Sequence, residues 1–279
     1  SEMCIRDRSY YYFLSDLVRD FDANSDEIVR RLAEVAKIIF AKSNLFIETI
    51  GESGEVSAVK DHLYEIADDL PDGNVYQKHT FDFAEGNKNE AFLTSGKVQY
   101  VGEGGDFRKY GFNYTGALRV METILRYEYL WKKVRVQGGA YGAFTQFLSD
   151  GTAILCSYRD PNLKQTLETY KNLPEYIRTL ELSDREMTKY VIGTMAADEI
   201  QLTPSMKGER AMLHYLNGNS VENRRKVNDE IVNCTVEDIR KLAPLLQSVI
   251  DHSSICVMGN EEKIHQDADV FDKILSLPD

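Results

Sequence analysis

Long apolar runs are missing from this sequence. No stretch approaches the roughly 20 apolar residues that a helix needs to span a bilayer, and no basic segment followed by an apolar one marks a secretory signal. Positive charge is also in short supply, since 33 lysines and arginines face 45 acidic residues and give a formal net charge of −12. We therefore expect a protein of the cytoplasm whose partners include neither a membrane nor a nucleic acid.

Cysteine is scarce, and the few cysteines lie far apart. None stands in a Cys-x-x-Cys pair, so the spacing predicts neither a zinc knuckle nor a disulfide framework. Buried free thiols in a reducing compartment are the expected state of these side chains. The four are Cys4, Cys156, Cys234 and Cys256.

Shifts in composition divide the chain into four parts. Residues 1–8, SEMCIRDR, resemble a translated sequencing-adapter scar, and we interpret them as an artefact. Residues 9–70 predict helices at 26–41 and 57–67 on either side of a strand at 44–52, which we interpret as the tail of a preceding domain. Residues 71–88 are rich in Pro, Gly, Asn and Asp and predict a linker. The final domain covers residues 89–279.

The final domain groups its strands and helices and does not alternate them strictly. We predict a long strand over 90–101, a turn-rich loop over 102–109 and a helix over 114–132, and near the end a strand over 253–258 and a short helix. Between these, 204–216 and 221–232 predict helices, and capping boxes at Ser183 and Thr235 open two more. Pro174 and Pro244 predict breaks. The grouping favours an α+β fold, an antiparallel sheet with helices packed on one face.

Residues 130–161 carry the densest local signals. Three glycines provide the backbone freedom that a helix-to-strand corner needs. A phosphate-binding loop is the alternative for them, but the pattern is not Gly-x-Gly-x-x-Gly and runs from helix to strand. The packing corner is therefore the favoured interpretation of Gly138, Gly139 and Gly142.

A hairpin follows that corner. Asp150-Gly151 predicts a tight turn between two alternating strands. Asp160-Pro161 predicts a helix N-cap with proline at the first helical position, so we assign these two residues to capping and not to catalysis.

Several motifs, in order, resemble one peptidase family. They are VRVQGGAYGAF at 134–144, SYRDP at 157–161, KYVIG at 189–193 and CVMGN at 256–260. Together they resemble the C-terminal half of the presequence-protease zinc peptidases, which form with falcilysin a branch of the insulinase, or inverzincin, superfamily. The resemblance covers residues 90–279 well and 10–69 more weakly. It implies an insulinase-type α+β domain, like those of the mitochondrial processing peptidase, preceded by the remnant of another.

The resemblance also implies where zinc is bound. The family holds the metal in its N-terminal half on an HxxEH helix, whose two histidines bind zinc while the glutamate activates water. This sequence comes nearest at residues 62–66, where Ile66 stands in place of the second histidine, and we interpret His62 and Glu65 as a solvated helical pair. We expect zinc only in the missing N-terminal half and none in this chain. The other histidines are predicted to be surface or cap residues: His79, His214, His252 and His265.

By the same resemblance, the C-terminal half contributes one arginine and one tyrosine to the substrate, and these match Arg135 and Tyr141. A phenol hydroxyl can stabilise the oxygen of an attacked peptide carbonyl, and a guanidinium can hold a backbone carbonyl of the substrate. The alternative is structural: Arg135 would end a helix favourably against its dipole, and Tyr141 would be an ordinary strand aromatic.

Two functions remain open at this point. The chain is either the substrate-clamping C-terminal half of a zinc oligopeptidase, which hydrolyses unfolded peptides in a closed chamber, or a non-catalytic insulinase-like module for assembly or peptide binding. The first requires a peptide substrate and the missing N-terminal catalytic half as partners, and predicts no activity from this chain alone. The presence of both Arg135 and Tyr141 favours it.

Overall fold

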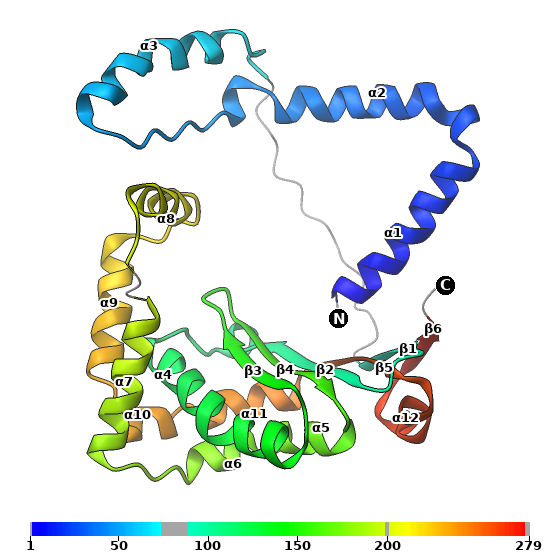
Figure 1. Ribbon diagram of the computed structural model, residues 1–279, viewed down its shortest axis with the longest axis vertical. Helices are drawn as coiled ribbons and strands as arrows, with labels where there is room; N and C mark the ends of the chain where they lie inside the picture. The colour runs from blue at the N-terminus through cyan, green and yellow to red at the C-terminus, as the bar shows by residue number, and fades with distance from the viewer. Residues whose placement is uncertain (1, 74–88, 199–200, 277–279) are drawn as a thin grey trace. The chain divides into compact units, whose positions relative to one another are not determined.

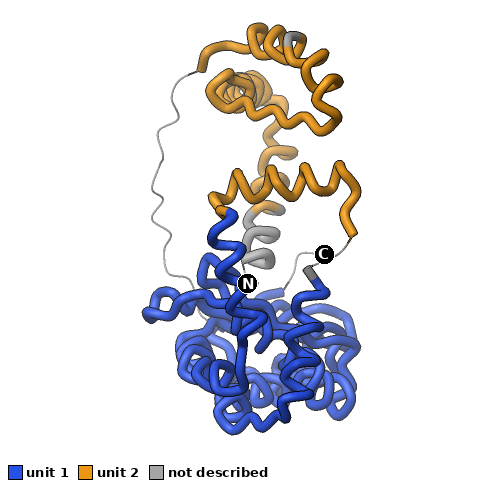
Figure 2. The backbone as a smooth tube through the Cα atoms, turned by 90° about the vertical axis from the view of Figure 1, so that its left-hand side faces the viewer, with its two compact units in different colours: residues 1–8, 85–200, 221–279 blue, residues 9–84, 201–220 orange. Residues whose placement is uncertain are grey.

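The structure is a computed structural model that describes residues 2–73, 89–198 and 201–276 and divides the chain into two compact units (Figure 2). We call residues 1–8, 85–200 and 221–279 the sheet unit, and residues 9–84 and 201–220 the helical unit. Residues 74–88 of the predicted linker, with His79 among them, lie outside the described residues, and the proposed domain boundaries stay a prediction.

A six-stranded sheet with the order β3-β4-β2-β5-β1-β6 organises the sheet unit (Figure 1). Strands β3 (Gly142–Phe147), β4 (Thr152–Asp160), β2 (Gln99–Asp106) and β5 (Ser254–Asn260) pair antiparallel to one another. Strand β1 (Asn89–Thr94) runs parallel to both β5 and β6 (Lys273–Ser276). The α+β class is confirmed, but the sheet is mixed and not purely antiparallel, because only strands joined by a tight hairpin are forced to alternate in direction.

The predicted long strand over 90–101 is wrong, because it is two strands. The chain turns between Thr94 and Gln99, and β5 inserts between β1 and β2. The predicted loop over 102–109 is also largely wrong, since β2 continues to Asp106. Its glycines mark close backbone approach: a Cβ on Gly104 would stand 2.8 Å from the carbonyl oxygen of Ala153 on β4.

Helices cover one face of this sheet. Figure 1 shows α4 (Gly116–Ile124), α5 (Lys164–Lys171), α6 (Leu173–Arg178) and α11 (Ala243–Asp251) along it, and α4 continues directly into a π-helix, η3 (Leu125–Gln137). Alternate strand residues point into a single core with the apolar faces of the helices, and each fully buried leucine there contributes about 1.5–3 kcal/mol. Core members from both layers include Val101, Leu155, Val257, Leu118, Met121 and Leu125.

The remaining helix limits follow local signals closely. Both predicted capping boxes are present and open α7 (Asp184–Asp198) and α10 (Val236–Arg240). Pro174 lies in the first turn of α6 and Pro244 in that of α11, so both predicted breaks are confirmed. The other elements of the sheet unit are η2 (Arg108–Tyr110), α9 (Val221–Val232), α12 (Glu261–Gln266) and η4 (Ala268–Val270).

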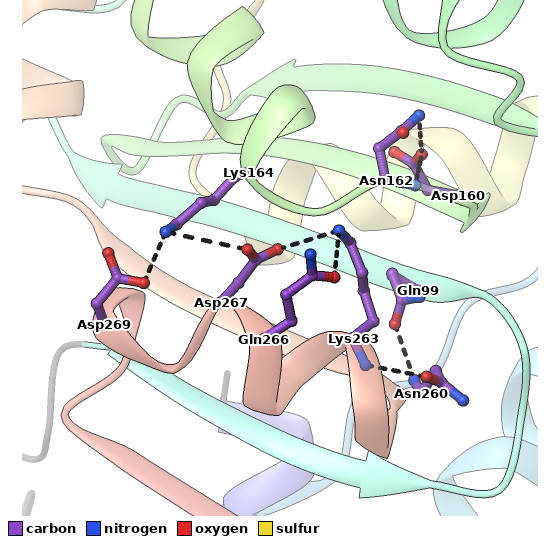
Figure 3. A network of polar contacts seen from close by, with 9 residues as sticks. All are labelled: Gln99, Asp160, Asn162, Lys164, Asn260, Lys263, Gln266, Asp267 and Asp269. Carbon is purple, nitrogen blue, oxygen red and sulfur yellow. Dashed lines mark hydrogen bonds and ion pairs between the residues drawn. The ribbon is translucent and has the colours of Figure 1, made fainter.

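A polar network fixes the end of β5 and the turn after α12 (Figure 3). Lys164 Nζ on α5 lies 2.6 Å from Asp269 Oδ1 and 3.9 Å from Asp267 Oδ1. The backbone N–H of Asn260 donates to Gln99 Oε1 over 2.8 Å, and a Cβ on Gly259 would stand 1.9 Å from that same oxygen. A larger side chain at 259 would therefore displace the Gln99 amide from its bond to Asn260.

The helical unit contains α2 (Phe21–Ile39), η1 (Lys42–Asn44), α3 (Ser53–Asp68) and α8 (Pro204–Leu216). Helix α1 (Glu2–Arg19) runs through residues 2–8, whose interpretation as an artefact stays a prediction. The predicted strand at 44–52 is wrong, because this segment pairs with no strand in the part of the chain that the structure describes. It packs on α8 instead, where the Phe46 and Tyr215 rings stack at 5.4 Å. No helix among the described residues combines the length and apolarity needed to cross a membrane.

Candidate functional site

The site begins on the π-helix η3. Its buried residues recur at intervals of four to five: Leu125, Tyr129, Leu130 and Val134. That spacing fits i→i+5 winding, which is rare in proteins and frequent at functional sites. Tyr129 anchors the helix, because its hydroxyl donates to the carbonyl of Thr169 over 3.0 Å, and burial raises its pKa to about 12. Arg135 therefore extends from a helix that is fixed along its inner side.

Two of the three corner glycines are demanded by the backbone. Gly139 has a φ of +81°, which favours glycine, and a Cβ on Gly138 would stand 2.5 Å from the carbonyl oxygen of Val134. Gly142 has neither constraint, since a Cβ there would meet Tyr158 Cβ at 4.0 Å. The corner is confirmed as a packing device, but Gly142 belongs to strand β3.

A bulge in β4 faces the corner. Between the pairs Val101↔Ser157 and Gln99↔Asp160, β4 holds one residue more than β2, and Arg159 has a φ of 49°. Positive φ in a non-glycine residue is strained, and bulges of this kind re-aim side chains near active sites. The N–H of Tyr141 donates to the carbonyls of the two bulge residues, at 3.1 Å to Tyr158 and 3.4 Å to Arg159. The bulge therefore binds the backbone of Tyr141, just before β3 begins.

Asp160 is not the helix N-cap that its sequence context predicts. It is buried at the end of β4, and α5 begins only at Lys164. Its Oδ1 accepts from the N–H of Asn162 at 2.9 Å and its Oδ2 from Thr166 Oγ1 at 2.7 Å. Figure 3 shows Asn162 beside Asp160. Asn162 Nδ2 also donates to the carbonyl of Gly138 at 2.6 Å. Asp160 thus ties the end of β4 to the end of η3 and caps a turn.

Arg135 and Tyr141 are brought together by this corner. The guanidinium Cζ of Arg135 lies 5.9 Å from the centre of the Tyr141 ring, and the Tyr141 side chain is 67 % exposed. The phenol is therefore accessible to a ligand, beside a fixed positive charge. Their assigned roles in substrate binding and catalysis stay predictions.

Three aromatic residues of the site were missed from the sequence. Trp131 lies under Arg135 with its ring centre 4.0 Å from Cζ. Tyr158 meets the Tyr141 ring edge-on at 5.9 Å and Tyr100 at 5.3 Å. The i,i+4 spacing of Trp131 and Arg135 on one helix was the available signal for the first contact. The other two are cross-strand contacts, which no local pattern specifies.

No group of three or more His, Cys, Asp or Glu residues in the described ranges could hold a metal ion. His62 and Glu65 form the predicted exposed pair on α3, 3.2 Å apart. His252 stacks on Tyr110, and His265 Nε2 lies 3.9 Å from a Glu261 oxygen. The chemistry offered here is hydrogen bonding and positive charge from the corner, without a donor set for zinc.

Three further titratable side chains with raised pKa values lie in the sheet unit, away from Arg135 and Tyr141. Burial raises the pKa of the Glu103 carboxyl, which accepts a hydrogen bond from Ser253 Oγ at 2.7 Å. Burial likewise raises the pKa of the Cys156 thiol, and that of Cys234 to about 12. These thiols are poor nucleophiles at neutral pH.

Comparison with known proteins agrees with this architecture. The family described as PreP C-terminal domain matches residues 89–261. Protein HypA of Clostridium perfringens is 41 % identical over 96 % of this chain and 27 % of its own length. Presequence protease 1, chloroplastic/mitochondrial, of Arabidopsis thaliana is 29 % identical over 92 % of this chain and 24 % of its own length. The chain therefore spans about a quarter of the length of these relatives.

Solved structures share the fold at low sequence identity. A peptidase M16 inactive domain from Pseudomonas fluorescens has a TM-score of 0.53 at 14 % identity, over 73 % of this chain and 50 % of its own. A protease from Helicobacter pylori has a TM-score of 0.52 at 16 % identity, over 75 % and 53 %. The insulinase-type domain that the sequence motifs imply is thereby confirmed as a fold.

Proposed function

This chain belongs to the PreP C-terminal domain family, and from that premise we propose that it is the substrate-clamping half of a zinc-dependent oligopeptidase. The observation that carries the proposal is the corner itself. A π-helix, a glycine turn and a strand bulge bring Arg135 to within 5.9 Å of an exposed Tyr141. The proposed substrate is an unfolded peptide enclosed in a chamber, and the proposed partner is an N-terminal catalytic half.

The two side chains supply complementary interactions. When water attacks a peptide carbonyl, negative charge develops on the carbonyl oxygen, and the Tyr141 hydroxyl can donate to that oxygen. Arg135 has planar N–H donors that suit a backbone carbonyl next to the scissile bond. Because a pre-oriented donor acts mainly on the transition state, we expect Tyr141 to affect the chemical step and Arg135 to affect substrate affinity.

Zinc in this proposal belongs to the full-length protein. The described residues offer no set of ligands for it, so no catalytic step is assigned to a metal in this chain. The chain alone is then expected to be inactive on peptides. The location that we propose for the protein is the cytoplasm. Stoichiometric zinc in the purified 279-residue chain, or peptidase activity from it, contradicts the proposal.

The decisive experiment is Tyr141→Phe in the full-length protein. Removal of the hydroxyl keeps the ring and its packing on Tyr158, and is expected to lower kcat about a hundred- to a thousandfold with KM little changed. Tyr127→Phe is the matched control, because Tyr127 is an exposed tyrosine on η3 away from the corner. An unchanged kcat for Tyr141→Phe removes this role and leaves the non-catalytic module as the better account.

A further inference from the structure

Trp131 is the single tryptophan of the chain, and it lies on the outer side of η3. Its neighbour Leu130 is fully buried, whereas Trp131 is 44 % exposed. One turn later the pattern repeats: Val134 is buried and Arg135 is not. The two buried residues anchor the inner side of the helix, so the outer pair is held at a fixed i,i+4 spacing.

The Arg135 guanidinium lies near two aromatic rings. Its Cζ is 4.0 Å from the centre of the Trp131 ring and 5.9 Å from the centre of the Tyr141 ring. Among the described residues no carboxylate forms an ion pair with Arg135. An arginine without a carboxylate partner would sample many rotamers, and a stacked indole restricts them while the N–H edges stay free to donate.

We propose that Trp131 is a positioning residue, whose indole face holds the Arg135 guanidinium beside Tyr141 so that both present themselves to a peptide as one unit. This rests on the proposed function, since it adds a residue to the same site. Trp131 acts through Arg135: it supplies orientation, whereas Arg135 supplies the hydrogen bonds. It therefore affects substrate affinity more than the chemical step.

The first test uses the 279-residue chain and its own fluorescence. Because Trp131 is the only indole, its emission and its quenching by acrylamide report on this contact without a label. Arg135→Ala uncovers one face of the indole and is expected to raise the quenching constant, with Arg135→Lys in between. Lys241→Ala, which removes an exposed cation that pairs with Asp238 at the end of α10, is the control and is expected to leave quenching unchanged. Equal quenching in the wild type and in Arg135→Ala overturns the proposal.

The second test is a double-mutant cycle on the full-length protein. Trp131→Ala is expected to raise KM about two- to fivefold, the range that an exposed cation–π contact corresponds to, with kcat little changed. Trp131→Phe, which keeps an aromatic face, is expected to restore most of the affinity. In an Arg135→Ala background, Trp131→Ala is expected to change nothing further. An equal rise in KM in both backgrounds overturns the proposal, because Trp131 would then act independently of Arg135.

The two tests separate this inference from the function on which it rests. If Arg135→Ala leaves KM unchanged, the substrate role of Arg135 is wrong and the affinity effect of Trp131 is lost with it. The quenching result still decides whether Trp131 holds the guanidinium. If Arg135→Ala raises KM but Trp131→Ala does not, the clamp stands and the positioning role is wrong.

Discussion

The two units of this chain bury their apolar residues very differently. In the sheet unit a single core joins both layers, and residues such as Leu118 are completely buried. Among the described residues of the helical unit, Ala41 is the only buried hydrophobic one. Helix α2 exposes large side chains along its length, including Val29, Leu32 and Ile39. An amphipathic helix normally covers its apolar face. The sheet unit is thus a closed domain, whereas the helical unit presents apolar faces that its own described residues do not cover.

Matched leucine truncations test most directly whether the two units differ in the burial of their apolar side chains. Leu118→Ala in the sheet unit is expected to lower the free energy of unfolding by about 2–5 kcal/mol, because it leaves a cavity in a closed core. Leu32→Ala in the helical unit, where the side chain is 62 % exposed, is expected to change it by about 0.5 kcal/mol or less. Urea unfolding of both variants measures the difference. Equal losses would show that α2 has a partner in this chain.

A smaller loss of stability is expected when the hydrogen bond between Thr166 and Asp160, next to the glycine corner, is removed. Thr166→Val removes the hydroxyl that donates to buried Asp160 and leaves a carboxylate oxygen without that partner, at a cost of about 1–3 kcal/mol. Thr169→Val on the same helix is the control, because the exposed Thr169 hydroxyl bonds only within its own helix. Thermal unfolding distinguishes them, and a similar loss in both would mean that the corner depends little on Asp160.

The smallest expected effect is a difference in pH dependence between the units. In the sheet unit burial raises the folded-state pKa of Glu103 above the usual 4.5, so the folded state binds this proton more readily and stability falls as pH rises above 4.5. In the helical unit the exposed Glu27 accepts from Arg30, its pKa falls to about 2, and stability is lost as pH falls from 4.5 towards 2.

Glu103→Gln keeps the acceptor for Ser253 and is expected to flatten the stability profile above pH 4.5. Glu27→Gln is expected to act only below pH 4.5, and weakly, because exposed pairs are screened by salt. Unfolding curves across pH 3–8 for the two variants make the measurement. A Glu103→Gln profile parallel to that of the wild type would show that this carboxyl has no raised pKa in the folded protein.

Local chemistry was predictable from the sequence. The capping boxes at Ser183 and Thr235 and the Asp150-Gly151 turn depend on atoms within three residues of each other, so short patterns specify them. The resemblance of the glycine corner to a known family also placed Arg135 and Tyr141 in one site, which spacing alone could not.

Non-local geometry was not predictable in the same way. The strand predicted over 90–101 contains a turn that is needed only because a distant strand, β5, inserts there. The glycines of β2 predict a loop when only neighbouring residues are considered, because a local pattern holds no information on their neighbours in β4 and β5. The bulge at Arg159 and the contact of Tyr100 with Tyr158 likewise arise from strand pairing.

The insertion of β5 between β1 and β2 has a consequence for biosynthesis. The Ser253 hydroxyl meets Glu103 across 150 residues of chain, and the strand that follows Ser253 fills the middle of the sheet. After β1 and β2 have been translated, nearly the whole sheet unit must follow before β5, the strand that pairs with both of them, is available. Contacts of such long sequence separation fold slowly, and unpaired edges invite wrong pairing meanwhile. The nascent chain therefore passes through its most aggregation-prone stage just before β5 emerges.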